Sequence, residues 1–575
     1  MKKLLRYLAD YKKECILGPL FKALEVVFEL MVPLVVASMI DRGIGGGDRA
    51  HIIRMALLMA LLAAVGLTST LTAQFFAAKA AVGFAANLRH ALMSHIQRLT
   101  FSDLDRIGSS ELITHMTGDV NQVQTGVNLA IRLLTRSPII VFGAMIMAFT
   151  VDFKSALVFA GVIPLLGGVV LTVMLVTIPM YRRVQGQLDT VTDSARDTLD
   201  GVRAIRAFRL ESRETARFRE KNSLLTAMQE KVGGIAALMN PATYVLINGA
   251  VILLIYIGAV RVNAGGLTQG SVIALYNYMS QILVELIKLA NLIITLNKTA
   301  ACADRIAAVL ETGGEPDTAS APPEISPANA GSIRFSHVSF TYPDAAAPAL
   351  SDISFSAERG EVIGVIGGTG SGKSTLVSLI PRFYEPTEGS IVIDGIPSPD
   401  YEKQALRARV GVVPQKAMLF HGTIRENLKW GNPAADDAAL RQALETAQAA
   451  DVVSAKEKGL DEPVTEGGRN FSGGQRQRLT IARALVKRPA FLILDDSASA
   501  LDYATDLKLR QALRILPDAP TVFIVSQRTA SIQHADRILV LEDGRLAGIG
   551  RHDELLESCP VYREIYDSQF PKEVR

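Results

Sequence analysis

One stretch in the second half of the chain, Gly367 to Thr375 (GGTGSGKST), constrains its fold most strongly. It fits the phosphate-loop pattern G-x-x-x-x-G-K-[ST]. Residues 361–366 (EVIGVI) read as a short buried strand before it, and residues 376–381 (LVSLIP) begin like a helix after it. In such a unit the glycines let backbone N–H groups close around phosphate oxygens. A chance glycine-rich turn would lack these flanks, so the pattern predicts a domain that binds a nucleoside triphosphate.

Each part of this loop has an expected role. Lys373 would reach the terminal phosphates, and the Ser374 hydroxyl would bind Mg²⁺. The predicted ATP-binding residues of the loop are Gly367, Gly368, Thr369, Gly370, Ser371, Gly372, Lys373, Ser374 and Thr375.

The composition indicates a membrane portion beside this domain. The chain has 575 residues, too many for one domain, and 49% of them are hydrophobic although only 6% are aromatic. A net charge of +3 gives no case for a nucleic-acid partner. The three cysteines, at positions 15, 302 and 559, are far apart, so we expect free thiols and neither a disulfide framework nor a metal site.

Six long apolar runs in the first half predict six membrane-spanning helices, because a span needs roughly 20 apolar residues. The short third run would borrow residues 127–134 before it. The two long connections, 87–119 and 181–231, are charged and helix-like, so we expect helices that continue beyond the membrane. We expect these segments on the cytoplasmic side, because they and the N-terminus are rich in Lys and Arg. The sequence shows no signal cleavage site, which fits a bacterial inner membrane best. The runs are 16–40, 55–78, 137–151, 155–180, 235–260 and 272–296.

Charged residues inside these runs leave two interpretations open. They could form the polar wall of a substrate cavity, since charge in lipid is costly, or they could be ion pairs that neutralise themselves within a helix. The sequence does not choose between the two. The residues concerned are Lys22, Glu25 and Glu29 on one helical face, Arg132 and Arg136 at the start of the third span, and Glu285 and Lys288 one turn apart.

The second half begins after a Pro/Ala/Gly/Ser-rich segment. We therefore predict a transmembrane domain at 1–310, a linker at 311–331 and a nucleotide-binding domain at 332–575. Residues 333–340 alternate as a strand, and the nearby Tyr342 could stack on the adenine ring.

Three further motifs follow in order. Gln415 comes just after an apolar strand at 410–413 and is a suitable ligand for Mg²⁺ or its water. Asp495 ends the apolar run 491–494, so a buried strand would present its carboxylate to Mg²⁺. Between them lies a loop that leads into a helix expected at 479–487, where backbone N–H groups could hold an anion. That loop contains Ser472, Gly473, Gly474 and Gln475.

The order of these motifs, completed by Ser499 to Asp502, resembles the nucleotide-binding domain of an ABC transporter. With six spans before it, the chain resembles a half-transporter of the type I ABC exporter class over nearly its whole length. The resemblance implies a six-helix all-α transmembrane domain followed by an α/β P-loop domain, with ATP and Mg²⁺ as ligands. It further implies that Tyr342 stacks on adenine and that Ser472, Gly473, Gly474 and Gln475 form a signature loop that completes the ATP site of a second subunit. Asp502 belongs to the D-loop in this resemblance.

Two residues depart from the family pattern. The position of the catalytic glutamate holds Asp496, whose carboxylate is one methylene shorter, and the position of the switch histidine holds Gln527. An amide can hydrogen-bond the γ-phosphate but cannot exchange a proton at neutral pH as His does. The chain therefore resembles the hydrolysis-impaired half of a heterodimeric exporter, whose partner would supply Glu and His. A homodimeric exporter and an ATP-gated channel remain alternatives. The substrate stays open among drugs, lipids and peptides.

Overall fold

The computed structural model describes residues 2–315, 325–343, 345–497, 499–516 and 519–570. The chain divides into two compact units, of which the first comprises Met1–Gln97 and Ser110–Thr312 and the second comprises Arg98–Ser109 and Gly313–Arg575. The predicted linker at 311–331 includes residues 316–324, which lie outside the described residues.

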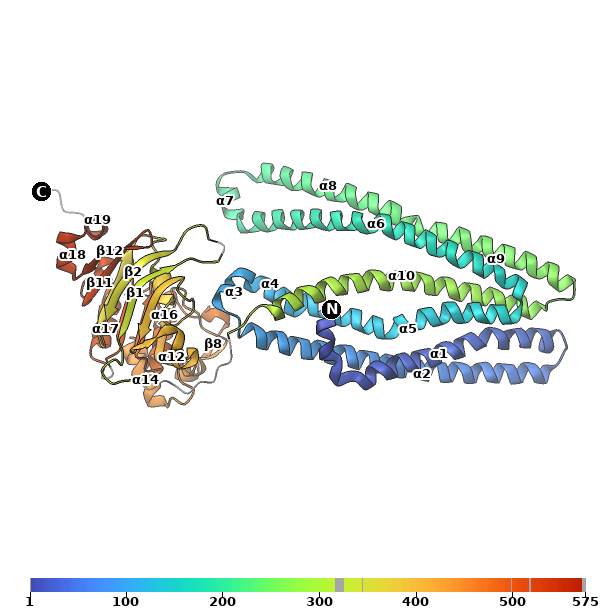
Figure 1. Cartoon of the computed structure of the whole chain (residues 1–575), viewed down its shortest axis with the longest axis horizontal. Coiled ribbons are helices and arrows are strands. Elements are labelled where there is room, and N and C mark those ends of the chain that lie inside the picture. The colour runs from blue at the N-terminus through green and yellow to red at the C-terminus, as the bar shows by residue number, and fades with distance from the viewer. Residues whose placement is uncertain (1, 316–324, 344, 498, 517–518, 571–575) are drawn as a thin grey trace. The chain divides into compact units, whose positions relative to one another are not determined.

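The first unit consists of helices, most of them long (Figure 1). They are η1 (Lys2–Tyr11), α1 (Lys12–Ser38), η2 (Met39–Ile44), α2 (Arg49–Ile96), α4 (Ser109–Thr114), η3 (His115–Asp119), α5 (Val120–Val151), α6 (Phe153–Asp200), α7 (Val202–Ala207), α8 (Glu211–Ala237), α9 (Met239–Asn263) and α10 (Gln269–Glu311).

Six helical stretches in this unit are long and apolar enough to cross a membrane, which confirms the six spans predicted from the sequence. α2 and α6 each contain 48 residues. At 1.5 Å per residue such a helix is about 72 Å long, more than twice the roughly 30 Å hydrocarbon layer. The predicted helical extensions beyond the membrane are therefore present.

The core of the first unit lies where α1, α5 and α10 pack together. Buried apolar side chains from these helices, such as Val26, Ile140 and Ile282, fill the contact. The Tyr278 hydroxyl donates a hydrogen bond of 2.7 Å to the backbone carbonyl of Leu30, so α10 is also fixed to α1 by a polar contact.

The second unit is built on a six-stranded sheet in the order β12-β11-β3-β10-β9-β6. All strands except β12 pair in parallel. A second sheet, β2-β1-β4-β5, is antiparallel, and apolar side chains of β1 and β3 share one core beneath it. The strands are β1 (Ile333–Phe340), β2 (Leu350–Ala357), β3 (Val362–Gly367), β4 (Glu388–Ile393), β5 (Ile396–Pro397), β6 (Val410–Val413), β7 (Gly422–Thr423), β8 (Pro463–Val464), β9 (Phe491–Asp495), β10 (Thr521–Val525), β11 (Arg537–Glu542) and β12 (Arg545–Gly550).

The second unit also contains helices, most of them short, and most of these connect the strands. They are α3 (Phe101–Ile107), α11 (Lys373–Ser378), η4 (Ser398–Asp400), α12 (Lys403–Arg409), α13 (Ile424–Lys429), α14 (Asp437–Thr446), α15 (Ala450–Ser454), η5 (Gly459–Asp461), η6 (Glu466–Gly468), α16 (Gly473–Val486), α17 (Tyr503–Arg514), η7 (Thr529–Ser531), α18 (His552–Ser558) and α19 (Pro560–Gln569). The helix expected at 479–487 begins six residues earlier, at Gly473, because Ser472 and Gln475 cap each other at its start.

Candidate nucleotide-binding site

The predicted site residues follow the carboxyl ends of four parallel strands. The phosphate loop follows β3, Asp495 ends β9, and Gln415 and Gln527 come two residues after β6 and β10. The carboxyl ends of parallel strands lie at the same edge of a sheet, so the fold brings these residues to one edge.

The phosphate loop connects β3 to α11. Its last glycine, Gly372, has φ of 93°, and a Cβ atom there would lie 2.7 Å from the backbone oxygen of Ala349. Only glycine fits this position without strain. The Lys373 ammonium donates hydrogen bonds to the carbonyl oxygens of Gly367, at 3.0 Å, and Gly368, at 2.5 Å. The lysine thus lies along the inner side of the loop, and burial lowers its pKa.

Ser374 and Asp495 meet beside this loop. The Ser374 hydroxyl donates a hydrogen bond of 3.0 Å to Asp495 Oδ1. Burial raises the pKa of the Asp495 carboxyl, although the Ser374 bond and the charge of Lys373 act in the opposite direction. A hydroxyl and a carboxylate oxygen at this separation suit Mg²⁺, which prefers oxygen ligands. The two side chains therefore fit the predicted metal role.

Asp496 lies next to Gln415. Gln415 Nε2 donates a hydrogen bond of 3.3 Å to Asp496 Oδ2. Asp496 has φ of 45°, in the left-handed region, and its N–H bonds the Val525 carbonyl of β10 at 3.0 Å. Asp tolerates this region better than most residues, and such strained positions cluster at functional sites. The backbone thus turns sharply where a catalytic carboxylate is expected.

The loop that carries Gln527 is held by a residue that the sequence analysis did not identify. Gln569, the last residue of α19, donates from Nε2 to the Gln527 carbonyl at 2.7 Å. Its Oε1 accepts from the Thr529 N–H at 2.9 Å and from the Thr529 hydroxyl at 3.0 Å. One amide side chain therefore satisfies three polar groups of this loop. No local motif marks Gln569, because the contact joins segments about 40 residues apart.

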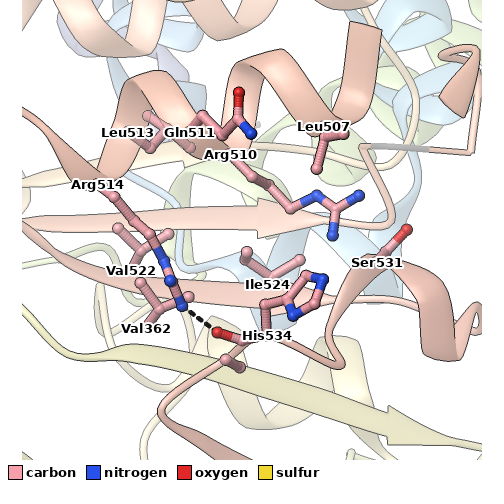
Figure 2. Close-up of a pocket in the computed structure, with 11 residues that line it drawn as sticks. Val362, Leu507, Arg510, Gln511, Leu513, Arg514, Val522, Ile524, Ser531 and His534 are labelled. Atoms are coloured by element: carbon pink, nitrogen blue, oxygen red, sulfur yellow. Dashed lines mark hydrogen bonds between the residues drawn. The ribbon is translucent and has the colours of Figure 1, made fainter. Parts of the chain in front are cut away.

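The other side of the same loop borders α17. A cavity of about 190 Å³ lies between α17, β10 and η7. Figure 2 shows Arg510, Ile524 and Ser531 among the side chains that line it. Arg510 bonds the Ala530 carbonyl at 2.8 Å and Asp506 at 2.7 Å. Asp502, the predicted D-loop residue, caps α17 by accepting from the Thr505 N–H at 3.1 Å. The D-loop and the Gln527 loop are thus joined through one helix.

Tyr342 lies beside the phosphate loop. Its hydroxyl is 3.0 Å from the Thr375 hydroxyl, and its ring meets Phe340 and Tyr384 edge to face, with centroids 4.8 Å and 5.3 Å away. The Tyr384 hydroxyl in turn donates to Asp105 at 2.5 Å. The aromatic residue predicted to stack on adenine is therefore connected to the Arg98–Ser109 segment of the same unit.

The predicted signature loop forms the start of α16. Ser472 Oγ accepts from the Gln475 N–H at 3.3 Å, and Gln475 Oε1 accepts from the Ser472 N–H at 3.0 Å. A Cβ atom on Gly473 would meet no atom within 4 Å, so the backbone is open there. In the described part of the chain, no hydrogen bond joins this loop to residues 367–375.

Comparison with known protein families identifies both halves. Residues 15–286 match the ABC transporter transmembrane region, and residues 350–499 match the ABC transporter family. In structure, the chain is similar to a bacterial Atm1-family ABC exporter with ATP bound, with a TM-score of 0.81, 24% sequence identity and complete coverage of both chains. At this identity the likeness shows the fold.

Relatives of similar length match along nearly the whole chain. An uncharacterized ABC transporter ATP-binding protein of Mycobacterium tuberculosis (strain ATCC 25618 / H37Rv) is 35% identical, covering 98% of this chain and 97% of the relative. The uncharacterized ABC transporter ATP-binding protein YfiB of Bacillus subtilis (strain 168) is also 35% identical, covering 100% and 99%. An ATP-dependent lipid A-core flippase of Chromobacterium violaceum is 30% identical, covering 99% and 97%.

Proposed function

The chain belongs to the ABC transporters, as an exporter with a transmembrane region fused to an ATP-binding domain, and we propose that it is the hydrolysis-impaired half of a heterodimer. Its signature loop would complete the working ATP site of a different half-transporter. Its own phosphate loop would hold ATP and hydrolyse it slowly.

One observation carries this proposal. The signature loop keeps the family pattern, whereas the residues around the chain's own phosphate loop depart from the family pattern at two positions. Ser472 to Gln475 retain the open, capped helix start that an anion site needs. In contrast, Asp496 reaches one methylene less far than glutamate, and a misplacement of about 1 Å can cost roughly 10²-fold in rate. Gln527 cannot take up a proton at neutral pH as the usual histidine can.

We assign the remaining residues on the same basis. Lys373 and the loop N–H groups would bind the β- and γ-phosphates, and Tyr342 would stack on adenine. Ser374, Asp495 and Gln415 would hold Mg²⁺, which neutralises charge on the phosphate oxygens when it is bound. Gln415 would also connect the metal to Asp496, since the two side chains are in contact.

The transport cycle would follow alternating access. ATP would close two nucleotide-binding domains, and the helical extensions would pass this motion to the spans. Hydrolysis at the partner's site would reset the pair. The cytoplasmic face of a bacterial inner membrane, where ATP is available, suits the basic N-terminus and the long connections.

We propose an amphipathic substrate, with a lipid favoured over a drug. Two relatives that are 30% and 31% identical are ATP-dependent lipid A-core flippases. A homodimeric exporter is the second candidate, because symmetric pairs are the commoner arrangement among oligomers.

Restoring the two family residues tests the proposal. We expect D496E/Q527H to raise ATP hydrolysis at this chain's own site by about 10-fold or more, measured by vanadate trapping of a photoreactive ATP analogue on this chain in the reconstituted complex. The matched control is D553E, which alters an exposed aspartate on α18 that is not among the predicted site residues. Unchanged trapping in D496E/Q527H would contradict the impaired-site proposal.

A further inference from the structure

Charged residues from three predicted spans meet around Arg136 in the first unit. Arg136 of α5 donates hydrogen bonds to Glu25 and Glu29 of α1, with Glu29 Oε2 at 3.0 Å, and to Glu285 Oε1 of α10 at 3.3 Å. One guanidinium thus bonds three carboxylates, which are 107 to 149 positions away in the sequence.

Two lysines balance the remaining charge. Lys22 Nζ bonds Glu25 at 2.6 Å, and Lys288 Nζ bonds Glu285 at 2.7 Å. With Arg136 and the three carboxylates, the group is neutral, and each of its carboxylates already has a cationic partner. Most of the group is buried, but the Lys288 side chain is 43% exposed. The group therefore has no carboxylate left for a further cation.

Arg132 lies one helical turn before Arg136, on the same face of α5. Unlike the charged residues around Arg136, it has no partner of opposite charge among the described residues. In the part of the chain that the structure describes, Arg132 has no hydrogen bond or ion pair, and its Nε atom is buried. Adding Arg132 to the neutral group gives a local charge of +1. A buried guanidinium nitrogen without a hydrogen-bond partner lowers the stability of the folded protein. An anion bound beside Arg132 would remove this cost by accepting a hydrogen bond and balancing the charge.

The depth of Arg132 indicates where that anion comes from. Arg132 lies 19 residues before the end of α5 (151 minus 132), and Lys288 lies 19 residues after the start of α10 (288 minus 269). Each distance is about 29 Å along a helix, close to the roughly 30 Å hydrocarbon thickness. In the proposed topology both residues therefore lie at the cytoplasmic edge of the hydrocarbon layer, at the level of lipid head groups.

We infer that Arg132 binds the anionic head group, a phosphate or carboxylate, of an amphiphile in the inner leaflet. The inference rests on the proposed export function, which supplies the membrane orientation, and it deepens that function by naming an anionic substrate class. A guanidinium can bond two oxygens of a phosphate at once, which gives both affinity and orientation. A cationic amphiphile would find the carboxylates of this group already occupied.

The test titrates phosphatidylglycerol into the purified complex in detergent and counts bound lipids by native mass spectrometry. We expect R132Q to weaken phosphatidylglycerol binding by about 10-fold, because a charge-assisted contact is lost, and R132K to keep part of it. R182Q is the control, since Arg182 is an exposed arginine on α6 outside this group. Phosphatidylcholine binding should stay equal in all variants.

Equal phosphatidylglycerol binding in R132Q and the unchanged protein would overturn the inference, as would an equal loss in R182Q. Loss of the complex itself in R132Q would also overturn it, because Arg132 would then contact protein. Stimulation of ATP hydrolysis by phosphatidylglycerol that depends on Arg132 would identify the anion as a transported head group. Arg132-dependent binding without ATP-driven transport of any amphiphile would support the site and contradict the proposed export.

Discussion

Lys373 and Gly473 lie in the two parts of this chain that would serve different ATP sites. If the chain is the impaired half of a heterodimer, K373A should lower ATP hydrolysis by the complex less than about 3-fold. G473D should lower it at least about 100-fold, because a carboxylate in the open signature loop would repel phosphate of ATP at the partner's site. Steady-state hydrolysis by the reconstituted complex measures both.

The two variants separate the proposed heterodimer from its alternative. An aspartate at Gly473 meets no atom within 4 Å at its Cβ, so the fold of this chain should tolerate it. In a homodimer each site needs both residues, and both variants would abolish hydrolysis. Equal losses would therefore contradict the asymmetric arrangement.

At the scale of elements, α19 holds the loop after β10 through Gln569. Removing its amide in Q569A deletes three hydrogen bonds, each contributing about 0.5–1.5 kcal/mol. We expect amide hydrogen exchange in residues 526–531 to become about 10-fold faster or more. S568A is the matched control, because among the described residues Ser568 bonds only the Ile565 carbonyl of its own helix. Unchanged exchange in Q569A would show that α19 does not hold this loop.

A second element-scale contact involves the Arg98–Ser109 segment, which belongs to the second unit. Glu315 accepts two bonds from Arg407, each 2.7 Å, while its own N–H bonds the Arg98 carbonyl at 2.7 Å. Burial raises the pKa of the Glu315 carboxyl, but the bonds from Arg407 and the charges of Arg407 and Lys403 outweigh burial and hold the pKa below its ordinary value.

This pKa direction fixes how stability depends on pH. A carboxyl whose pKa is lower in the folded state stabilises the fold above its unfolded pKa, and this contribution disappears as the pH falls through the folded value. We therefore expect E315Q to melt below the unchanged chain at pH 7 and the two to converge below about pH 4.5. Thermal unfolding in detergent across this pH range measures the difference. A constant difference at all pH values would exclude ionised Glu315 as its cause.

At the scale of the whole molecule, the sequence predicts those elements that are encoded by a short contiguous stretch of residues. The phosphate loop, its flanking strand and helix, and the six spans each follow from contiguous residues. The structure has a helix or strand overlapping each of them, although several of the membrane helices extend well beyond the predicted apolar runs. The sequence prediction puts the start of α16 too late, because the helix begins where Ser472 and Gln475 cap each other.

Contacts between distant segments could not be predicted. Periodicity placed Glu25 and Glu29 on one face of a helix, but it could not tell that Arg136 faces them from α5. The contact of Gln569 with Gln527 has no local pattern either. Such pairings depend on which helices pack together, and a single sequence does not contain that information directly.

The measurement that most directly tests the central claim is purification of this chain from its native membrane in mild detergent, with identification of what accompanies it. The account predicts a second six-span ABC chain, present in equal amount, with Glu and His at the positions of Asp496 and Gln527 and an altered signature loop. Recovery of copies of this chain alone would contradict the heterodimer, and Asp496 and Gln527 would then have to support all of its ATP hydrolysis.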